Sequence, residues 1–298
     1  MRQSGRQFPQ GCQAVALLFI TRCLADSIGH QSDKSPGQFR HVDAFTNRRF
    51  SGNPAAVCFL DSWLDDGWLR KVAAENNLSA TAFLVREGDN YAIRWFTRVC
   101  EIRLCGHATF ASAFVVLHYL EPTRKSVQFK TQHAGLITVQ RAGDCLSMDL
   151  PAFSPTTCKT VPDDLIKGLG PSSSPDDVLE ANSTYFIVFN NPETVRRLRP
   201  DLPRIETLHP YAVSVSAKDD TVDFVSRYFA PGYGLPEDPV TGSAHCGLAP
   251  YWAKRLGKGR LHAKQVSERG GEMWCEMSGD RVKLTGKAVL TLHGEFSL

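Results

Sequence analysis

The feature of this chain that most constrains its fold is a repeat at an offset of 136 residues. The offset relates Gly106 to Gly242 and the dipeptide Gly143-Asp144 to Gly279-Asp280. In both halves a glycine precedes an apolar predicted helix, and three predicted strands follow that helix. A helix that is apolar nearly all round must be enclosed by other elements. The sequence therefore predicts an α+β fold of two pseudo-symmetric domains, each a β-sheet rolled around a central α-helix.

The repeat also suggests the domain boundaries. We expect an extension over residues 1–37, a first helix-in-sheet domain over 38–151 and a second over 152–287. The C-terminal strand, 288–298, is a candidate to cross back to the first domain. The segment 151–175 is rich in Pro, Ser and Thr, which is typical of a linker or crossover.

Composition excludes several functions. Lys and Arg total 34 against 31 Asp and Glu, so a net charge of +3 gives no electrostatic argument for nucleic acid or an anionic membrane. No apolar run approaches the roughly 18 residues of a membrane span. Nine cysteines without a CxxC pair argue against a disulfide framework and a zinc ribbon. We therefore expect a cytoplasmic protein, and the absence of an HExxH motif or other ligand cluster predicts no metal site.

The arginine-containing start of residues 1–37 weakly resembles an organelle-targeting segment. We favour the alternatives of a disordered extension or a start codon chosen too far upstream, because ordered patterning begins only near Gln38.

The chemistry is expected at the two helix starts, which read Cys105-Gly106-His107-Ala108 and Thr241-Gly242-Ser243-Ala244. The predicted helices run from His107 to Leu120 and from Gly242 to about Leu256. Free N–H groups and the positive end of the helix dipole make each start a site for a small anion. Two facing starts would hold a small carboxylated molecule, with His107 and Asp238 as acid–base groups.

Each of these side chains also has a purely structural interpretation. His107 could be satisfied by local backbone groups at the helix start. Asp238 could cap the second helix, where carboxylates are favoured, and Ser243 could be an ordinary helix-start polar residue.

Five segments, in order SGNPAAV, NLSATAF, LCGHATFAS, RYFAP and EDPVTGSAH, together resemble the phenazine-biosynthesis PhzF-like family, which includes animal phenazine-biosynthesis-like-domain proteins. The resemblance covers about residues 38–298. It implies the diaminopimelate epimerase-type fold of two pseudo-symmetric domains, in agreement with the repeat. It further implies an isomerase that uses no metal or organic cofactor and a possible homodimer.

The resemblance also assigns residues and exposes two departures. His107 and Asp238 correspond to groups that polarise the substrate and move protons, and Gly106, Gly242 and Ser243 to substrate-binding groups. Ala80 stands where the family has the glutamate of an NLSETAF-like segment, and an alanine cannot move a proton. Loss of a general base typically lowers the rate by about 10²–10⁴-fold. The second departure is Arg98, where relatives usually have proline after Phe-Thr.

Three hypotheses follow. The first is an isomerase in which another base, such as Glu101 or a bound water, replaces the glutamate. The second is a catalytically inactive ligand- or partner-binding protein. The third is a racemase with one thiol from each half, for which Cys105 would need a lowered pKa at its helix start. The offset partner of Cys105 is Thr241, and Cys246 lies one helical turn further on, which disfavours this third hypothesis.

Overall fold

The computed structural model describes residues 37–297, and these residues form one compact unit. The predictions about the N-terminal extension fall on residues 1–37 and so lie outside the described residues, apart from Gly37. Among the helices of the described part, none is long and apolar enough to cross a membrane.

The first half of this unit contains eight strands, two α-helices and one π-helix. Its elements are β1 (Gly37–Ala44), β2 (Asn53–Leu60), α1 (Asp66–Asn76), β3 (Ala80–Glu87), β4 (Asn90–Phe96), β5 (Glu101–Ile102), α2 (Gly106–Val115), the π-helix Val116–Leu120, β6 (Ser126–Lys130), β7 (Leu136–Ala142) and β8 (Cys145–Pro151).

The second half begins with a short strand and ends with the C-terminal strand of the described chain. Its elements are β9 (Thr156–Thr157), α3 (Asp163–Leu169), β10 (Asp177–Ala181), β11 (Thr184–Phe189), α4 (Pro192–Arg197), α5 (Leu202–Glu206), β12 (Ala212–Lys218), β13 (Phe224–Phe229), the 3₁₀ turn Pro231–Tyr233, α6 (Gly242–Leu256), β14 (Arg260–Gln265), β15 (Gly271–Ser278), β16 (Arg281–Gly286) and β17 (Ala288–Phe296).

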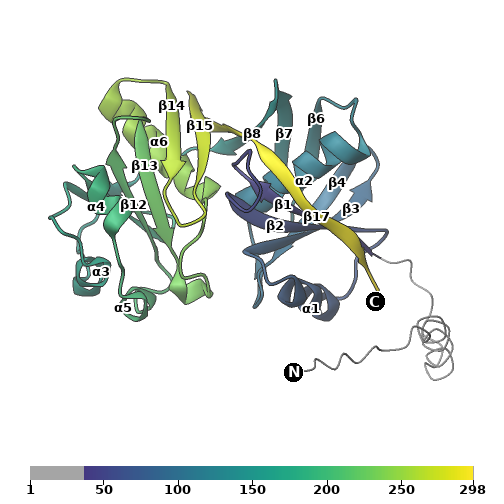
Figure 1. Ribbon diagram of the computed structural model, residues 1–298, viewed down its shortest axis with the longest axis horizontal. Helices are drawn as coiled ribbons and strands as arrows, with labels where there is room; N and C mark the ends of the chain where they lie inside the picture. Colours follow the sequence, from purple (N-terminus) through teal and green to yellow (C-terminus); the bar gives the residue numbers. More distant parts are fainter. Residues whose placement is uncertain (1–36, 298) are drawn as a thin grey trace, which may run out of the picture. The chain divides into compact units, whose positions relative to one another are not determined.

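The strand pairing repeats between the halves (Figure 1). In the first half β1, β2, β3, β4, β6, β7 and β8 pair in that order, with parallel pairs only at β2–β3 and β4–β6. In the second half β10 to β16 pair in the same pattern, with parallel pairs at β11–β12 and β13–β14. An antiparallel β8–β16 pair joins the two into one sheet.

Each half receives its edge strand from the other. β9 follows the last strand of the first half and pairs with β10, whereas β17 follows the last strand of the second half and pairs with β1. Both pairs are antiparallel, and the positions of β9 fall within β17 when the offset of 136 residues is applied. The pseudo-symmetry therefore includes the connections as well as the strands and helices.

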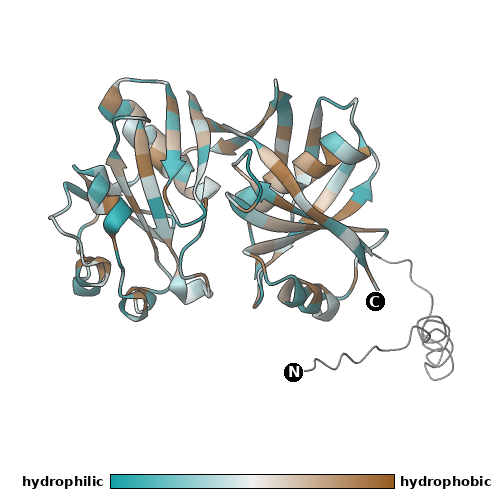
Figure 2. Cartoon of the chain, in the orientation of Figure 1, coloured by the Kyte–Doolittle hydropathy of each residue, from teal (hydrophilic) through white to brown (hydrophobic). Residues whose placement is uncertain are grey.

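In each half the strands surround one central helix, which is α2 in the first half and α6 in the second. Every residue of α2 except Gly106 is buried, and α6 buries Ala244, Leu248 and Trp252 among others. Hydrophobic and hydrophilic positions alternate along many strands in both halves, as the period of a half-buried strand requires (Figure 2). The predicted α+β fold, with a sheet rolled around one helix in each half, is confirmed.

Two local predictions need correction. The first central helix is α-helical only to Val115 and continues as a π-helix to Leu120. The segment 151–175 is more than a linker, because it contains β9 and α3. Helix α3 is only seven residues long, with Leu165 and Leu169 buried at i and i+4. A segment of this length is too short for helical periodicity to be recognised in the sequence.

Candidate functional site

The two helix starts meet inside the described unit. A methyl group placed on Gly106 would lie 3.9 Å from the Cα of Gly242, so the first residues of α2 and α6 approach each other closely. Neither helix has a side-chain cap, because Cys105 and Thr241 at the N-cap positions accept no hydrogen bond there. Free N–H groups and two positive dipole ends thus converge on one place.

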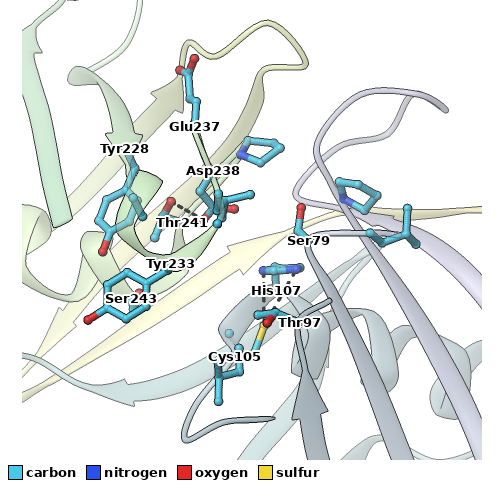
Figure 3. Close-up of a pocket in the computed structure, with 18 of the residues that line it drawn as sticks. Ser79, Thr97, Cys105, His107, Tyr228, Tyr233, Glu237, Asp238, Thr241 and Ser243 are labelled. Carbon is cyan, nitrogen blue, oxygen red and sulfur yellow. Dashed lines mark hydrogen bonds between the residues drawn. The ribbon is translucent and has the colours of Figure 1, made fainter. Parts of the chain in front are cut away.

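A cavity of about 500 Å³ opens at these helix starts, which is the size of a small-molecule site. Both halves line it. Its walls include Pro54, Asn77, Leu78, Ser79, Thr97, Arg98, Ile102, Cys105, Gly106 and His107 from the first half, and Tyr228, Tyr233, Gly234, Glu237, Asp238, Thr241, Gly242, Ser243 and Arg269 from the second. Figure 3 draws His107 and Ser79 on one side and Asp238, Thr241 and Tyr228 on the other. All five predicted site residues are therefore brought together.

His107 is the second residue of α2 and is held in the cavity wall with only 8% of its surface exposed. The polar neighbour of its ring is the Cys105 sulfur, 3.5 Å from Nδ1, and no backbone group of the described residues is hydrogen-bonded to the ring. His107 is therefore not a residue whose ring is satisfied by local backbone groups at the helix start. Burial lowers the pKa of His107 to about 3, so its imidazole is neutral at physiological pH.

Asp238 is buried at the opposite wall and is held by both halves. Asn53 Nδ2 from β2 donates to its Oδ1 at 2.7 Å, and Thr241 Oγ1 donates to its Oδ2 at 2.5 Å. Gln265 Nε2 donates to the Asp238 carbonyl at 2.6 Å, while its Oε1 accepts from the Thr241 N–H at 2.8 Å. Burial outweighs these hydrogen bonds and raises the pKa of Asp238 to about 6.

Asp238 and Ser243 are not helix caps. The carboxylate of Asp238 accepts from a side-chain amide and a hydroxyl, and not from an N–H of α6. Ser243 is exposed to the cavity, and its hydroxyl has no hydrogen-bond partner among residues 37–297. The Ser243 hydroxyl is thus available to a ligand, and Asp238 lines the cavity without capping α6.

The other charged groups near the cavity are mostly neutralised. Glu237 receives two hydrogen bonds from Arg227, at 2.7 and 2.9 Å, and Figure 3 draws its carboxylate apart from His107. Arg269 donates to the Asp43 carboxylate at 2.7 Å and to the Gly52 carbonyl at 2.9 Å, which ties the second half to the first. These pairs leave Asp238 as the buried carboxylate of the cavity wall.

Ala80 and Glu101 do not supply a further base here. Ala80 is fully buried in the hydrophobic core at the start of β3, paired with Ala55, and it is its neighbour Ser79 that lines the cavity. Both carboxylate oxygens of Glu101 accept from Arg94, at 2.7 and 2.6 Å, and Glu101 is not part of the cavity wall. The suggestion that Glu101 replaces the missing glutamate is therefore wrong for this geometry.

The thiols are also unsuited to proton transfer. Burial raises the pKa of Cys105 to about 12, against the expectation that its helix start would lower it. Cys246 has a pKa raised to about 12 by burial and lies outside the cavity wall, where Thr241 occupies the position opposite Cys105. Two facing thiolates are absent from residues 37–297, which contradicts the two-thiol mechanism.

Sequence reasoning missed the residues that hold Asp238. Asn53 belongs to the quoted segment SGNPAAV and Tyr228 to RYFAP, so both were visible as motif members without an assigned role. Gln265 carries no signal, because it comes from a strand 27 residues beyond Asp238 and only the fold brings the two together. Among the described residues no three His, Cys, Asp or Glu side chains are grouped so that they could hold a metal ion.

Comparison with known proteins agrees with the motifs. A family model described as phenazine biosynthesis-like protein matches residues 42–294. A protein of Pseudomonas aeruginosa named as an uncharacterized isomerase is 48% identical over 257 residues, which are 86% of this chain and 97% of that protein. The human phenazine biosynthesis-like domain-containing protein is 37% identical over 279 residues, covering 85% of this chain and 96% of that one. A crystal structure of a PhzF family protein from Enterococcus faecalis, 40% identical, matches with a TM-score of 0.83 over 89% of this chain and 100% of its own.

Proposed function

The chain belongs to the phenazine biosynthesis-like protein family, and we propose that it is an isomerase that relocates a proton on a small carboxylic acid by acid–base chemistry, without a cofactor. The names of curated relatives support the isomerase class. The substrate class and the residue roles rest on the geometry of the cavity.

One observation carries this proposal. A buried aspartate with a pKa of about 6 and a neutral histidine face the same cavity, from opposite halves, beside two helix starts. A base is most effective when its pKa lies near the working pH, and Asp238 meets that condition because burial has raised its pKa. His107, neutral throughout the physiological range, would serve as a hydrogen-bond donor or acceptor and not as an imidazolium acid.

The proposed step is a proton abstraction next to the substrate carboxylate. The Asp238 carboxylate takes the proton from carbon, and the electron pair of the broken C–H bond moves into the substrate carboxylate. The N–H groups at the starts of α2 and α6 stabilise the negative charge that accumulates there, because they are fixed donors with positive dipole ends. Glycine at positions 106 and 242 lets the carboxylate approach the backbone closely, and the Ser243 hydroxyl supplies a further donor. In an acid with a β,γ double bond the anion is shared between the α and γ carbons, so the protonated Asp238 returns the proton to the γ carbon and the double bond moves to the α,β position.

Hydrogen exchange at carbon tests this proposal. The protein is incubated in deuterated water with small carboxylic acids, and loss of C–H signals is followed by NMR. We expect Asp238→Asn and His107→Ala to lower the exchange rate by about 10²-fold or more. The matched controls are Asp61→Asn and His133→Ala, which change exposed side chains outside the cavity wall and should leave the rate unchanged. Equal rates in all four variants would overturn the roles of Asp238 and His107.

A second candidate function is favoured by Ala80. With the family's glutamate replaced and Glu101 paired to Arg94, the protein would bind a carboxylated ligand, or a partner, without turnover. The same exchange assay separates the candidates. Absence of exchange in the wild type with acids that bind would support the binding protein and contradict the active isomerase. Exchange in the wild type that Asp238→Asn abolishes would support the isomerase.

A further inference from the structure

Arg98 is a cationic side chain of the cavity wall to which the proposed reaction assigns no role. It lies between β4 and β5, in the loop that leads to the start of α2, and lines the same cavity as His107. The Arg98 guanidinium is therefore a cationic donor at a site where the proposed reaction itself does not require one.

The hydrogen bonds of Arg98 are weak and connect the two sides of the cavity. Its Nη1 donates to Asn77 Oδ1 at 3.3 Å, and its Nη2 donates to the Gly234 carbonyl at 3.2 Å. Both acceptors are neutral, and both distances are at the long end of the range for N–H···O bonds. Asn77 belongs to the first half and Gly234 to the second, so the guanidinium spans the cavity between them. Two neutral partners leave further N–H donors of Arg98 for a ligand.

Arg98 also differs from the other arginines around the cavity in its charge balance. Arg269 is paired with Asp43 at 2.7 Å, and Arg227 with Glu237 at 2.7 Å. Within the described range 37–297 no carboxylate lies within ion-pairing distance of Arg98. A charge-assisted, bidentate pair with an anion would be shorter and stronger than either bond that Arg98 now makes.

We propose that Arg98 is a specificity-determining residue that binds a second anionic group of the substrate, so that the preferred substrate is an acid with two anionic groups. One carboxylate would lie at the two helix starts, as the proposed function on which this inference rests requires. The second group, a carboxylate or a phosphate, would lie at Arg98 and replace the weak bonds to Asn77 and Gly234.

Ligand titration of the full chain tests the proposal. The probes are monocarboxylates (butyrate, valerate, hexanoate), dicarboxylates of equal length (succinate, glutarate, adipate) and 3-phosphonopropionate, each followed by NMR of ¹⁵N-labelled protein. We expect at least one dianionic probe to bind wild type about tenfold or more tightly than its matched monocarboxylate. Comparison of the dicarboxylates with the phosphonate shows whether the second group is a carboxylate or a phosphate.

Two variants locate the effect. Arg98→Gln should abolish the preference for dianions and leave monocarboxylate affinity within about threefold of wild type. Arg103→Gln removes the same charge from an exposed arginine just after β5, outside the cavity wall, and should keep the preference. Monocarboxylates that bind as tightly as dianions, or equal losses in both variants, would overturn the role of Arg98 while the proposed function stands. Failure of every acid to bind would overturn both.

Discussion

Replacing Asp238 by asparagine tests whether a buried, titrating carboxylate occupies the cavity wall. The substitution keeps the size of the side chain and one oxygen, so Asn53 can still donate to it at the position where it now donates at 2.7 Å. The new amide faces the Thr241 hydroxyl, which is able to turn and accept. What the substitution removes is the ionisation of the group.

The magnitude follows from the pKa. Burial raises the pKa of Asp238 from 3.8 to about 6, and this difference corresponds to about 3 kcal/mol between the native and unfolded states. Since the native pKa is the higher one, the native state holds the proton more tightly than the unfolded state does. The stabilising contribution is therefore complete below about pH 4 and is lost as the pH rises through about 6.

Urea denaturation of wild type and Asp238→Asn across this pH range measures the effect. Relative to wild type, the free energy of unfolding of the variant should rise by up to about 3 kcal/mol between about pH 4 and about pH 7. Contributions common to both proteins cancel in the difference. The exposed Asp61→Asn serves as control, and its difference from wild type should stay nearly constant. A constant difference for Asp238→Asn as well would refute the assignment of Asp238 as a buried base.

The remaining predictions concern the ring of His107 and two glycines. Because burial lowers its pKa to about 3, the ring protons of His107 should keep constant NMR shifts between about pH 5 and about pH 8, and a titration there would contradict a neutral imidazole. Gly106→Ala places a methyl group at ordinary contact distance, 3.5 Å from Met148 Cε, so the fold should persist. The affinity for carboxylic acids should fall about tenfold in NMR titration, because the methyl group keeps the carboxylate away from the backbone. Unchanged affinity would exclude close approach of the carboxylate to the backbone at this position. Gly52→Ala should lower the free energy of unfolding in urea by about 3 kcal/mol or more, because its φ is +66° and the new Cβ would lie 2.3 Å from the Ala44 carbonyl oxygen. Gly88→Ala is the control, since its φ is +60° and the space around its Cβ is open. Equal losses in the two variants would show that the contact at Gly52 relaxes.

The fold was predictable because the repeat preserves backbone requirements. Gly143 and Gly279, related by the offset, have φ values of +66° and +62° in the tight turns that follow β7 and β15. A left-handed turn position strongly favours glycine, so this signal survives when side-chain identity has diverged. The enclosure of α2 by strands was predictable as well, because a helix that is apolar on all sides has no polar face to turn toward solvent.

What could not be predicted depends on contacts between distant segments. The sequence placed Asp238 near a helix start, but its partners Asn53 and Gln265 come from β2 and β14. Glu101 was an acceptable candidate base in the sequence, and its exclusion needed the two hydrogen bonds from Arg94. The raised pKa of Cys105 has the same origin, because complete burial outweighs the helix dipole and is not visible in a single segment.

The duplication explains how one fold makes an asymmetric site from symmetric parts. The backbone contribution is the same on both sides, since Gly106 and Gly242 open equivalent helices whose N–H groups face one cavity. The side chains at the offset differ, because His107 corresponds to Ser243 and Asp238 corresponds to the apolar Ile102, which also lines the cavity. A single repeat would therefore supply an anion site with either a base or an imidazole, but not both. The proposed reaction, in which a substrate loses a proton on one face and meets a neutral hydrogen-bonding group on the other, requires both halves, and the Asn53–Asp238 bond between the halves holds the proposed base in that position.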